Sequence, residues 1–383
     1  MPRKPTQGPL QGIRILDLTR LLPGPLGTML MADMGAEVIK IEDPKQPDYV
    51  RMFPPFQNGE SLNYLSFNRS KLSVTIDLNS DEGKTQFFEL VKTADVVVEQ
   101  FRPNFLDKIG IGYEAAKAVN PKIIYVSITG YGQTGPYKNL AGHDLNYTAV
   151  AGVLGVTGSP DEPIAAGVQL ADIAGGSYMA VIAILSAIYA RTQTGLGQHV
   201  DVSMTDAVMP LLSAVYAHSQ GSSNGLLDWQ NHRGVFPLSG GLPNYGVFKC
   251  ADDKFIALGT LEPKFWQKFC TLINKIEWMA FMIPQNEAEA NQYKSQIAAL
   301  IITQPSDYWV KIGTENDLLI TLVHDLSDLE KDPHLQEREM IIEQEHPKAG
   351  KFKTIGVPIK FSETPAKPSW IAPDLGQDND ILK

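Results

Sequence analysis

The chain has 383 residues, of which 43% are hydrophobic and 20% charged, and its formal net charge is −10. This length is too great for one compact core, so two domains are expected. The acidic balance argues against nucleic acid as a partner, because phosphate binding needs a basic face.

Cysteine usage and the hydropathy pattern bear on location. Cys250 and Cys270 lack CxxC spacing, which fits a reducing compartment and predicts neither a disulfide framework nor a zinc site. The N-terminal stretch has no apolar core typical of a secretory signal. No run of about 18 uninterrupted apolar residues is present, so we expect no membrane association. A cytoplasmic location follows as the expectation.

The N-terminal half alternates apolar β-type runs with helical patterns, which predicts a parallel α/β sheet. Asn79, three residues before Glu82, is expected to cap one of the helices. The apolar run at 174–193 contains enough polar residues to be a core helix. The expected strands are 12–18, 37–42, 71–78, 95–101, 122–129 and 198–204, and the expected helices are 25–36, 81–94, 113–120, 174–193 and 205–220.

After a stretch rich in Gly, Ser, Asn and Pro, the pattern changes. Two apolar runs around a polar turn within 244–261 predict a hairpin, and helical patterns follow at 262–273 and 287–301. A strand-like run, GVPIKF, lies near the end. We therefore expect four regions: a large α/β domain over 1–220, a linker over 221–240, a small α+β domain over 241–325, and a return to the large domain over 326–383.

Nucleotide-binding and hydrolase motifs are not found. The first β-to-α turn, DLTRLLPGP, lacks the GxGxxG pattern of dinucleotide-binding folds. Neither a phosphate-binding P-loop nor a GxSxG nucleophile motif occurs. EQEH at 343–346 gives a single ExxH, whereas a di-iron site needs two, so this segment is interpreted as solvated surface.

Three acidic residues and a histidine are candidates for chemistry. In AGHDLNY, His143 and Asp144 lie where a helix can begin, and the Asp144 N–H could hold a developing oxyanion. Asp172 in LADIAGG precedes an apolar helix and could be a general base or a nucleophile. Glu262 precedes a helix that starts with proline. Taken separately, the stretches around His143 and Asp172 favour a structural explanation, helix capping and ordinary surface polarity, and Glu262 can be an acid stabilised by the helix dipole.

Five stretches resemble the family III CoA-transferases (CaiB/BaiF superfamily) and the α-methylacyl-CoA racemases that share their fold. They are residues 12–44, 98–137, 191–207, 332–340 and 356–365. The resemblance implies a large Rossmann-like domain and a small domain joined by two linkers into a ring. It also implies that two such rings interlock as a homodimer.

The resemblance implies two alternative activities. Racemases of this kind use a His in a GHD motif, here His143, and an Asp, here Asp172, to move a proton across the α-carbon of 2-methylacyl-CoA. A Glu in an EP motif, here Glu262, bonds the histidine, and the Asp144 amide would hold the enolate oxygen. We expect this epimerisation. The alternative is an acyl-CoA:carboxylate CoA-transferase with Asp172 as nucleophile, passing through an anhydride and an aspartyl-CoA thioester, since GVQLADIAGG looks transferase-like.

The resemblance also implies contacts with CoA. Lys71, Arg102 and Lys108 occupy the matching basic positions for its phosphates. The turn LLPGP, which contains Leu22, would press against the adenosine part. We expect no metal and no organic cofactor beyond the CoA that the substrate carries. A CoA-thioester-binding protein without activity is a third possibility, against which the complete set of His143, Asp172 and Glu262 argues.

Overall fold

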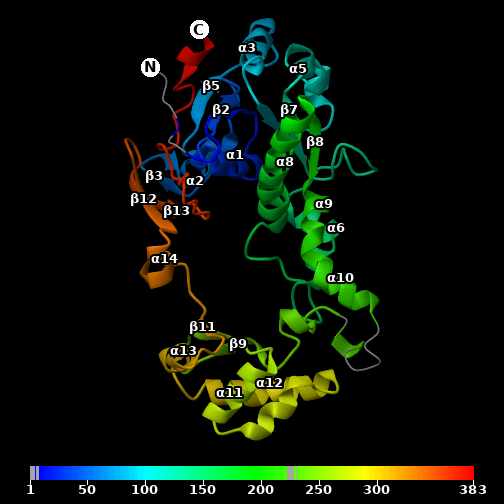
Figure 1. Cartoon of the computed structure of the whole chain (residues 1–383), viewed down its shortest axis with the longest axis vertical. Helices are drawn as coiled ribbons and strands as arrows, with labels where there is room; N and C mark the ends of the chain where they lie inside the picture. The colour runs from blue at the N-terminus through cyan, green and yellow to red at the C-terminus, as the bar shows by residue number, and fades with distance from the viewer. Residues whose placement is uncertain (1–4, 6–7, 222–227, 231) are drawn as a thin grey trace. The chain divides into compact units, whose positions relative to one another are not determined.

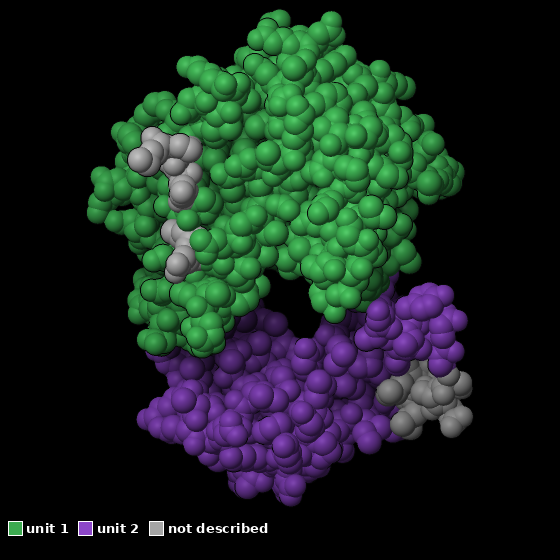
Figure 2. Space-filling model, turned by 45° about the horizontal axis from the view of Figure 1, so that its top comes forward, with its two compact units in different colours: residues 1–151, 167–210, 330–383 green, residues 152–166, 211–329 purple. Residues whose placement is uncertain are grey.

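The computed structural model describes residues 5, 8–221, 228–230 and 232–383. The chain forms two compact units, coloured separately in Figure 2. The first unit contains residues 1–151, 167–210 and 330–383, and the second contains 152–166 and 211–329.

The predicted boundaries therefore need correction, because 152–166 and 211–220 belong to the second unit. One reason is Arg233, whose guanidinium donates to the carbonyls of Gly155, Ser159 and Pro160 and so ties 152–166 to the following chain. A contact between segments so far apart in sequence leaves no local pattern. Within the predicted linker 221–240, residues 222–227 and 231 lie outside the described residues.

The first unit is built on a six-stranded sheet. Its strands lie in the order β5-β2-β1-β6-β7-β8, and every neighbouring pair is parallel. This is the order of doubly wound folds, in which the strand order reverses between two adjacent strands, here β1 and β6. The predicted α/β class with a large parallel-sheet domain is confirmed. The strands are β1 (Arg14–Asp17), β2 (Glu37–Glu42), β5 (Leu72–Thr75), β6 (Val96–Glu99), β7 (Ile124–Thr129) and β8 (His199–Ser203).

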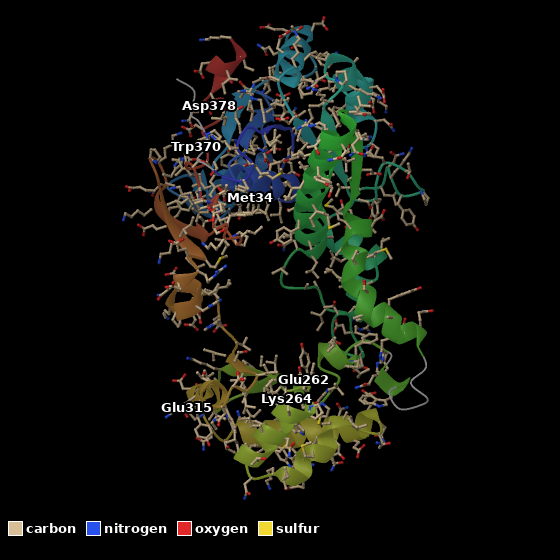
Figure 3. All side chains as sticks on the ribbon, in the orientation of Figure 1. Met34, Glu262, Lys264, Glu315, Trp370 and Asp378 are labelled. Carbon is tan, nitrogen blue, oxygen red and sulfur yellow. The ribbon has the colours of Figure 1, made fainter. Side chains whose placement is uncertain are left out.

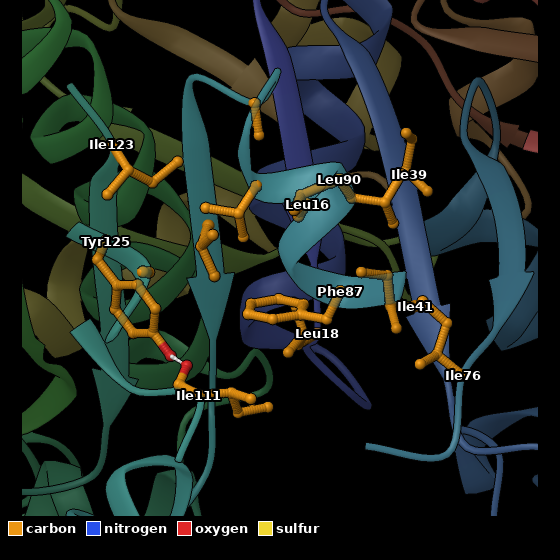
Figure 4. Packing of buried hydrophobic residues seen from close by; sticks show 14 of the residues in the cluster. Leu16, Leu18, Ile39, Ile41, Ile76, Phe87, Leu90, Ile111, Ile123 and Tyr125 are labelled. Carbon is orange, nitrogen blue, oxygen red and sulfur yellow. Dashed lines mark hydrogen bonds between the residues drawn. The ribbon is translucent and has the colours of Figure 1, made fainter. Parts of the chain in front are cut away.

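Helices cover both faces of this sheet. On one face, α3 (Asp81–Val91) and α5 (Tyr113–Val119) contribute Phe87 and Ala116 to a cluster that includes Leu16, Ile39 and Tyr125 from the strands (Figure 4). Side chains alternate along a strand, so their neighbours point to the opposite face. There α1 (Pro23–Asp33) and α8 (Met179–Thr194) pack, and α8 runs beside β7 and β8 (Figure 1).

The remaining elements of the first unit are short. The helices are α2 (Leu62–Asn68), α4 (Phe105–Lys108), α6 (Asp144–Val150), the π-helix η2 (Ala171–Tyr178), α9 (Met204–Val208) and α14 (Pro333–Glu337). Two hairpins pair β3 (Phe56–Gln57) with β4 (Glu60–Ser61) and β12 (Ile341–His346) with β13 (Gly350–Ile355). The C-terminal segment lies along β5, where Asp378 accepts the Ser73 N–H at 2.9 Å.

The second unit has its own core. The antiparallel sheet β11-β10-β9 packs on helices through buried tryptophans and phenylalanines, including Trp266, Phe269 and Trp309. The predicted hairpin is confirmed. The elements are α7 (Val153–Val156), α10 (Ser213–Gln220), β9 (Tyr245–Lys249), β10 (Phe255–Gly259), α11 (Pro263–Leu272), α12 (Glu287–Ile301), α13 (Ser306–Glu315) and β11 (Ile320–Leu322).

Three local predictions differ from the structure. Ser80, rather than Asn79, caps α3, and its hydroxyl accepts the Gly83 N–H at 2.9 Å. The helix expected over 205–220 breaks into α9, a 3-10 turn and α10 around Pro210, which cannot donate a backbone hydrogen bond. GVPIKF is not a strand, and the strands lie just before it, in β12 and β13.

The apolar helix made by η2 and α8 also differs from expectation. By length and composition alone, Ala171–Thr194 could cross a membrane, although core helices of soluble proteins meet the same criteria. Within the chain, 33% of its most apolar window is buried. The helix is therefore less covered by its own unit than a core helix would be.

Candidate active site

A cavity of about 570 Å³ lies within the first unit. It opens beyond the carboxyl ends of three neighbouring strands: Leu21 and Pro23 follow β1, Phe101 and Arg102 follow β6, and Tyr131 follows β7. The strand order reverses between β1 and β6, and open parallel sheets bind ligands at such a point. Because the backbone ends of several strands converge there, side chains far apart in sequence can face one ligand.

Buried charged side chains hold the loop after β1 in place. The carboxylate of Asp17 accepts bonds from the Lys71 ammonium at 2.9 Å and the Thr28 hydroxyl at 2.7 Å. Burial alone would raise the pKa of Asp17, but Lys71 and Lys40 hold it well below its usual range. The Lys40 ammonium in turn donates to the Thr19 carbonyl at 2.9 Å. This network fixes the loop that forms one wall of the cavity.

Two residues that were expected to contact CoA, Lys71 and Leu22, do not line the cavity. Lys71 is fully buried, and its ammonium also donates to the Pro25 carbonyl and to Asn68. A lysine so enclosed has no surface for a phosphate, and its predicted role is corrected to a structural one. Leu22 is not among the residues that line the cavity, although its neighbours Leu21 and Pro23 are.

His143 lies at the start of α6. It is the N-cap residue, its side chain is exposed, and it lines the cavity. Its backbone N–H donates to the Asn146 side chain at 3.0 Å, so the N–H of the N-cap residue has a hydrogen-bond acceptor in the first turn of the helix. The imidazole is thus delivered to the cavity from a fixed helix end, as the helix-start pattern predicts.

Asp172 reaches the same cavity from the π-helix η2. Two glycines let this helix pack closely: a Cβ at Gly175 would lie 2.6 Å from the Met204 carbonyl, and one at Gly176 would lie 2.8 Å from the Pro23 side chain. Burial and the neighbouring Asp144 raise the pKa of Asp172 to about 6, against the opposing effect of His143. A carboxyl with such a pKa can accept or donate a proton near neutrality.

Asp144 follows His143 in the chain and forms a hydrogen bond with the backbone of Asp172. It is the first residue of α6, and its carboxylate accepts the Asp172 backbone N–H at 2.9 Å. The carboxylate therefore fixes the start of η2 and raises the pKa of its neighbour. As the first helical residue, Asp144 has a backbone N–H without an acceptor inside the helix. The role of that N–H towards an enolate oxygen stays a prediction.

Glu262 belongs to the second unit. It is exposed and is the N-cap of α11, whose first residue is Pro263 (Figure 3). The predicted helix start is confirmed. The hydrogen bond to His143 that the resemblance implies stays a prediction, since the two residues lie in different units.

Of the basic residues expected at the phosphates, Arg102 is exposed and lines the cavity. Lys108, the last residue of α4, is exposed but is not among the lining residues, and its role stays a prediction. Lys138 lines the cavity, although no motif marks it. A single lysine in a loop carries no local signal, and only the fold brings it to this site.

Other lining residues also went unmarked in the sequence. Gln100 accepts the Gly24 N–H at 3.1 Å, which links the start of α1 to the loop after β6. Tyr131 and Tyr147 meet edge to face at 5.2 Å between ring centres. In the sequence, these residues could have been identified only by their place after a predicted strand, because polar or aromatic residues at the carboxyl end of a buried strand tend to face a ligand.

Metal and thiol chemistry receive no support. Among the described residues, no three His, Cys, Asp or Glu side chains gather in a way that could hold a metal ion. Cys250 and Cys270 are free and buried, and burial raises the pKa of Cys270 to about 12. A thiol of that kind is not a nucleophile at neutral pH.

Comparison with known proteins places this α/β ligand-binding fold in a family. Residues 10–379 match CoA-transferase family III. The chain is 32% identical over 372 residues to acetyl-CoA:oxalate CoA-transferase of Acetobacter aceti, covering 94% of this chain and 91% of that one. It is 32% identical over 339 residues to alpha-methylacyl-CoA racemase of Homo sapiens, covering 88% of this chain and 83% of that one.

A solved structure agrees. The CAIB/BAIF family protein from Brucella suis superposes with a TM-score of 0.81 at 30% identity and covers 98% of this chain and 99% of that one. The chain belongs to CoA-transferase family III, the CaiB/BaiF family. It is accordingly an enzyme that acts on acyl-CoA, as either a CoA-transferase or a racemase.

Proposed function

We propose that the protein epimerises 2-methylacyl-CoA thioesters by 1,1-proton transfer at the α-carbon through an enolate. The observation that carries this proposal is that His143 and Asp172 line one cavity. Inversion of a carbon requires a base on one face and an acid on the other. A single group would return the proton to the face it left.

The two groups differ in ways that suit this task. Asp172, with its pKa raised to about 6 by burial and by Asp144, can alternate between acid and base. The His143 imidazole is the second proton-transfer group that the inversion needs. A hydrogen bond from an imidazole N–H of His143 to the Glu262 carboxylate would fix the tautomer of the imidazole. The Asp144 N–H would hold the enolate oxygen, and removing such a donor costs on the order of 100-fold in rate.

CoA transfer to a carboxylate is the second candidate. Most of the relatives named for an activity are CoA-transferases, including succinyl-CoA:glutarate CoA-transferase of Mus musculus at 32% identity. In this reaction Asp172 attacks the thioester carbonyl, forms a mixed anhydride and releases CoA thiolate. The thiolate then attacks the aspartyl carbonyl, which gives an aspartyl-CoA thioester and releases the donor acid as its carboxylate. The acceptor carboxylate attacks this thioester, and the CoA thiolate released from it takes the acceptor acyl group from the second anhydride and frees Asp172. His143 has no necessary part in these steps.

Two substitutions separate the candidates. His143→Ala should abolish α-proton exchange in a racemase yet leave most of the transfer activity in a transferase. Asp172→Ala should remove either activity. Both variants would be assayed for deuterium entry and for CoA transfer to oxalate, succinate and glutarate. Transfer that survives His143→Ala, with no exchange by the unsubstituted protein, would establish the second candidate instead.

We also propose that two copies of the chain form the interlocked homodimer that the resemblance implies. Four apolar residues along η2 and α8, Tyr178, Ile182, Leu185 and Tyr189, are between 37% and 70% exposed. Their spacing of four, three and four residues places them on one helix face. A second copy of the chain is the occupant that would cover this stripe.

We propose that Arg102 and Lys138 bind the phosphates of the substrate's CoA, because both line the cavity that contains His143 and Asp172. No other organic cofactor and no metal enters the proposed reaction, which only moves a proton.

A further inference from the structure

Tyr147 is buried one turn into α6, with 8% of its surface exposed, and it lines the cavity. Its ring fills a space that two glycines leave open. A Cβ at Gly130 would lie 2.3 Å from the Tyr147 ring, and one at Gly142 would lie 2.7 Å from it. The backbone at Gly130 and at Gly142 therefore confines the ring from two sides.

The hydroxyl of Tyr147 holds the residue before His143. It donates a hydrogen bond to the Gly142 carbonyl at 2.5 Å. The N–H of the same peptide unit belongs to His143 and donates to the Asn146 side chain at 3.0 Å. Both ends of the Gly142–His143 peptide are thus bonded to side chains of α6. Because a peptide is planar, two such bonds fix its orientation and the position of the His143 Cα. The start of α6 on the other side of that Cα then sets the direction in which the imidazole leaves the backbone.

Tyr147 also remains a donor across the working pH range. Burial raises its pKa to about 12, and the charge of Asp172 adds to this rise. Tyr147 lines the same cavity as both proton-transfer groups, and its hydroxyl bonds a backbone carbonyl.

We propose that Tyr147 is a positioning residue, which acts through the Gly142–His143 peptide to aim the imidazole at the α-carbon opposite Asp172. This inference rests on the proposed racemase function for its effect on rate. Its effect on the geometry of His143 does not depend on that function.

Tyr147→Phe tests the proposal, because it keeps the ring between the two glycines and removes only the hydroxyl. We expect kcat for α-proton exchange to fall about 100-fold, as misplacement of a reacting group by about 1 Å can cause. KM should change little, because the cavity walls stay in place. A loss confined to KM, or no loss, would overturn the proposal.

Tyr125→Phe is the matched control. The Tyr125 hydroxyl is also buried and donates to a backbone carbonyl, that of Ile111, at 3.2 Å (Figure 4). Both variants lose one tyrosine–carbonyl bond and should lower Tm similarly, by roughly 2–4 °C. Only Tyr147→Phe should lower kcat. An equal fall of kcat in both variants would mean that stability alone explains the loss.

The second readout needs no substrate. In protein labelled at histidine Cε1, the His143 NMR signal can be assigned from its disappearance in His143→Ala. Tyr147→Phe should shift this signal, and Tyr125→Phe should leave it in place. An unmoved His143 signal in Tyr147→Phe contradicts the positioning role. A moved signal in a protein whose parent exchanges no α-proton supports the positioning role and rejects the racemase.

Discussion

The chemistry of the cavity depends on how one carboxylate influences another. Asp144 accepts the backbone N–H of Asp172 at 2.9 Å and, after burial, is the main cause of the raised pKa of that residue. One side chain therefore has two effects, one geometric and one electrostatic. They can be separated by removing the charge while keeping the oxygen that accepts the bond.

Asp144→Asn makes this separation. The amide oxygen can still accept the Asp172 N–H, but the negative charge is gone. Since that charge raises the pKa of Asp172, the pKa should fall from about 6 towards its ordinary value. The acidic limb of the rate against pH, which reports ionisation of Asp172, should therefore move to lower pH. A limb that stays in place would show that burial alone sets the pKa.

Glu99 gives a second pH-dependent prediction, this time for stability. It is 5% exposed at the end of β6, and burial raises its pKa from 4.5 to about 7. A carboxyl whose pKa is raised on folding stabilises the protein below its unfolded pKa, and this stabilisation is lost as pH rises through the folded value. Glu99→Gln cannot ionise, so it does not lose this stabilisation. The difference in free energy of unfolding, variant minus parent, should therefore rise by about 3 kcal/mol from pH 4 to pH 8.

Urea unfolding at several pH values measures this gain, with the exposed Glu82→Gln as the control. The control should show a difference from the parent that barely changes with pH. If Glu99→Gln behaved like the control, Glu99 would have to be solvated or paired in the folded protein.

Among the elements, the π-helix η2 most directly controls the site, because it presents Asp172. Its position depends on Gly175 and Gly176, which allow close contact with the Met204 carbonyl of α9 and with Pro23 at the start of α1. Gly175→Ala would place a methyl 2.6 Å from the Met204 carbonyl, which cannot move independently of its helix. We expect a loss of stability of about 1–3 kcal/mol and a large fall in kcat.

Gly155→Ala is the control for that substitution. Gly155 is also helical, in α7, but a Cβ there meets no atom within 4 Å. Alanine favours helix over glycine, so this variant should be as stable as the parent or more stable. If Gly175→Ala proved as stable as Gly155→Ala in thermal unfolding, η2 would tolerate the extra methyl and the proposed clash would be contradicted.

The sequence predicted the parallel strands and most helices, because their apolar runs are continuous and their starts carry capping residues. It also placed His143 at the start of α6 through the GHD pattern. It missed Tyr147, whose bond to Gly142 in the same stretch belongs to no motif considered. It missed Lys138, because only the fold brings this lysine to the cavity. It misjudged Lys71 because the partner of this lysine, Asp17, lies 54 residues earlier.

At the scale of the whole molecule, the apolar stripe on η2 and α8 makes the proposed homodimer testable. Ile182 is 53% exposed in the single chain, and a lysine there would place a charge in the interface. Ile182→Lys should shift the protein from dimer to monomer in sedimentation. Leu326→Lys, at a residue 88% exposed outside the stripe, should leave the dimer intact. A dimer that withstands Ile182→Lys would place the contact elsewhere.

Epimerisation, the central claim, can be tested with the unsubstituted protein. It would be incubated with (R)-2-methylacyl-CoA in D₂O, without any free carboxylate acceptor, and followed for deuterium at the α-carbon and for the S epimer. We expect both, with deuterium present in the newly formed epimer. No deuterium entry over a series of acyl chains would contradict it and would leave Asp172 as the nucleophile of a CoA-transferase.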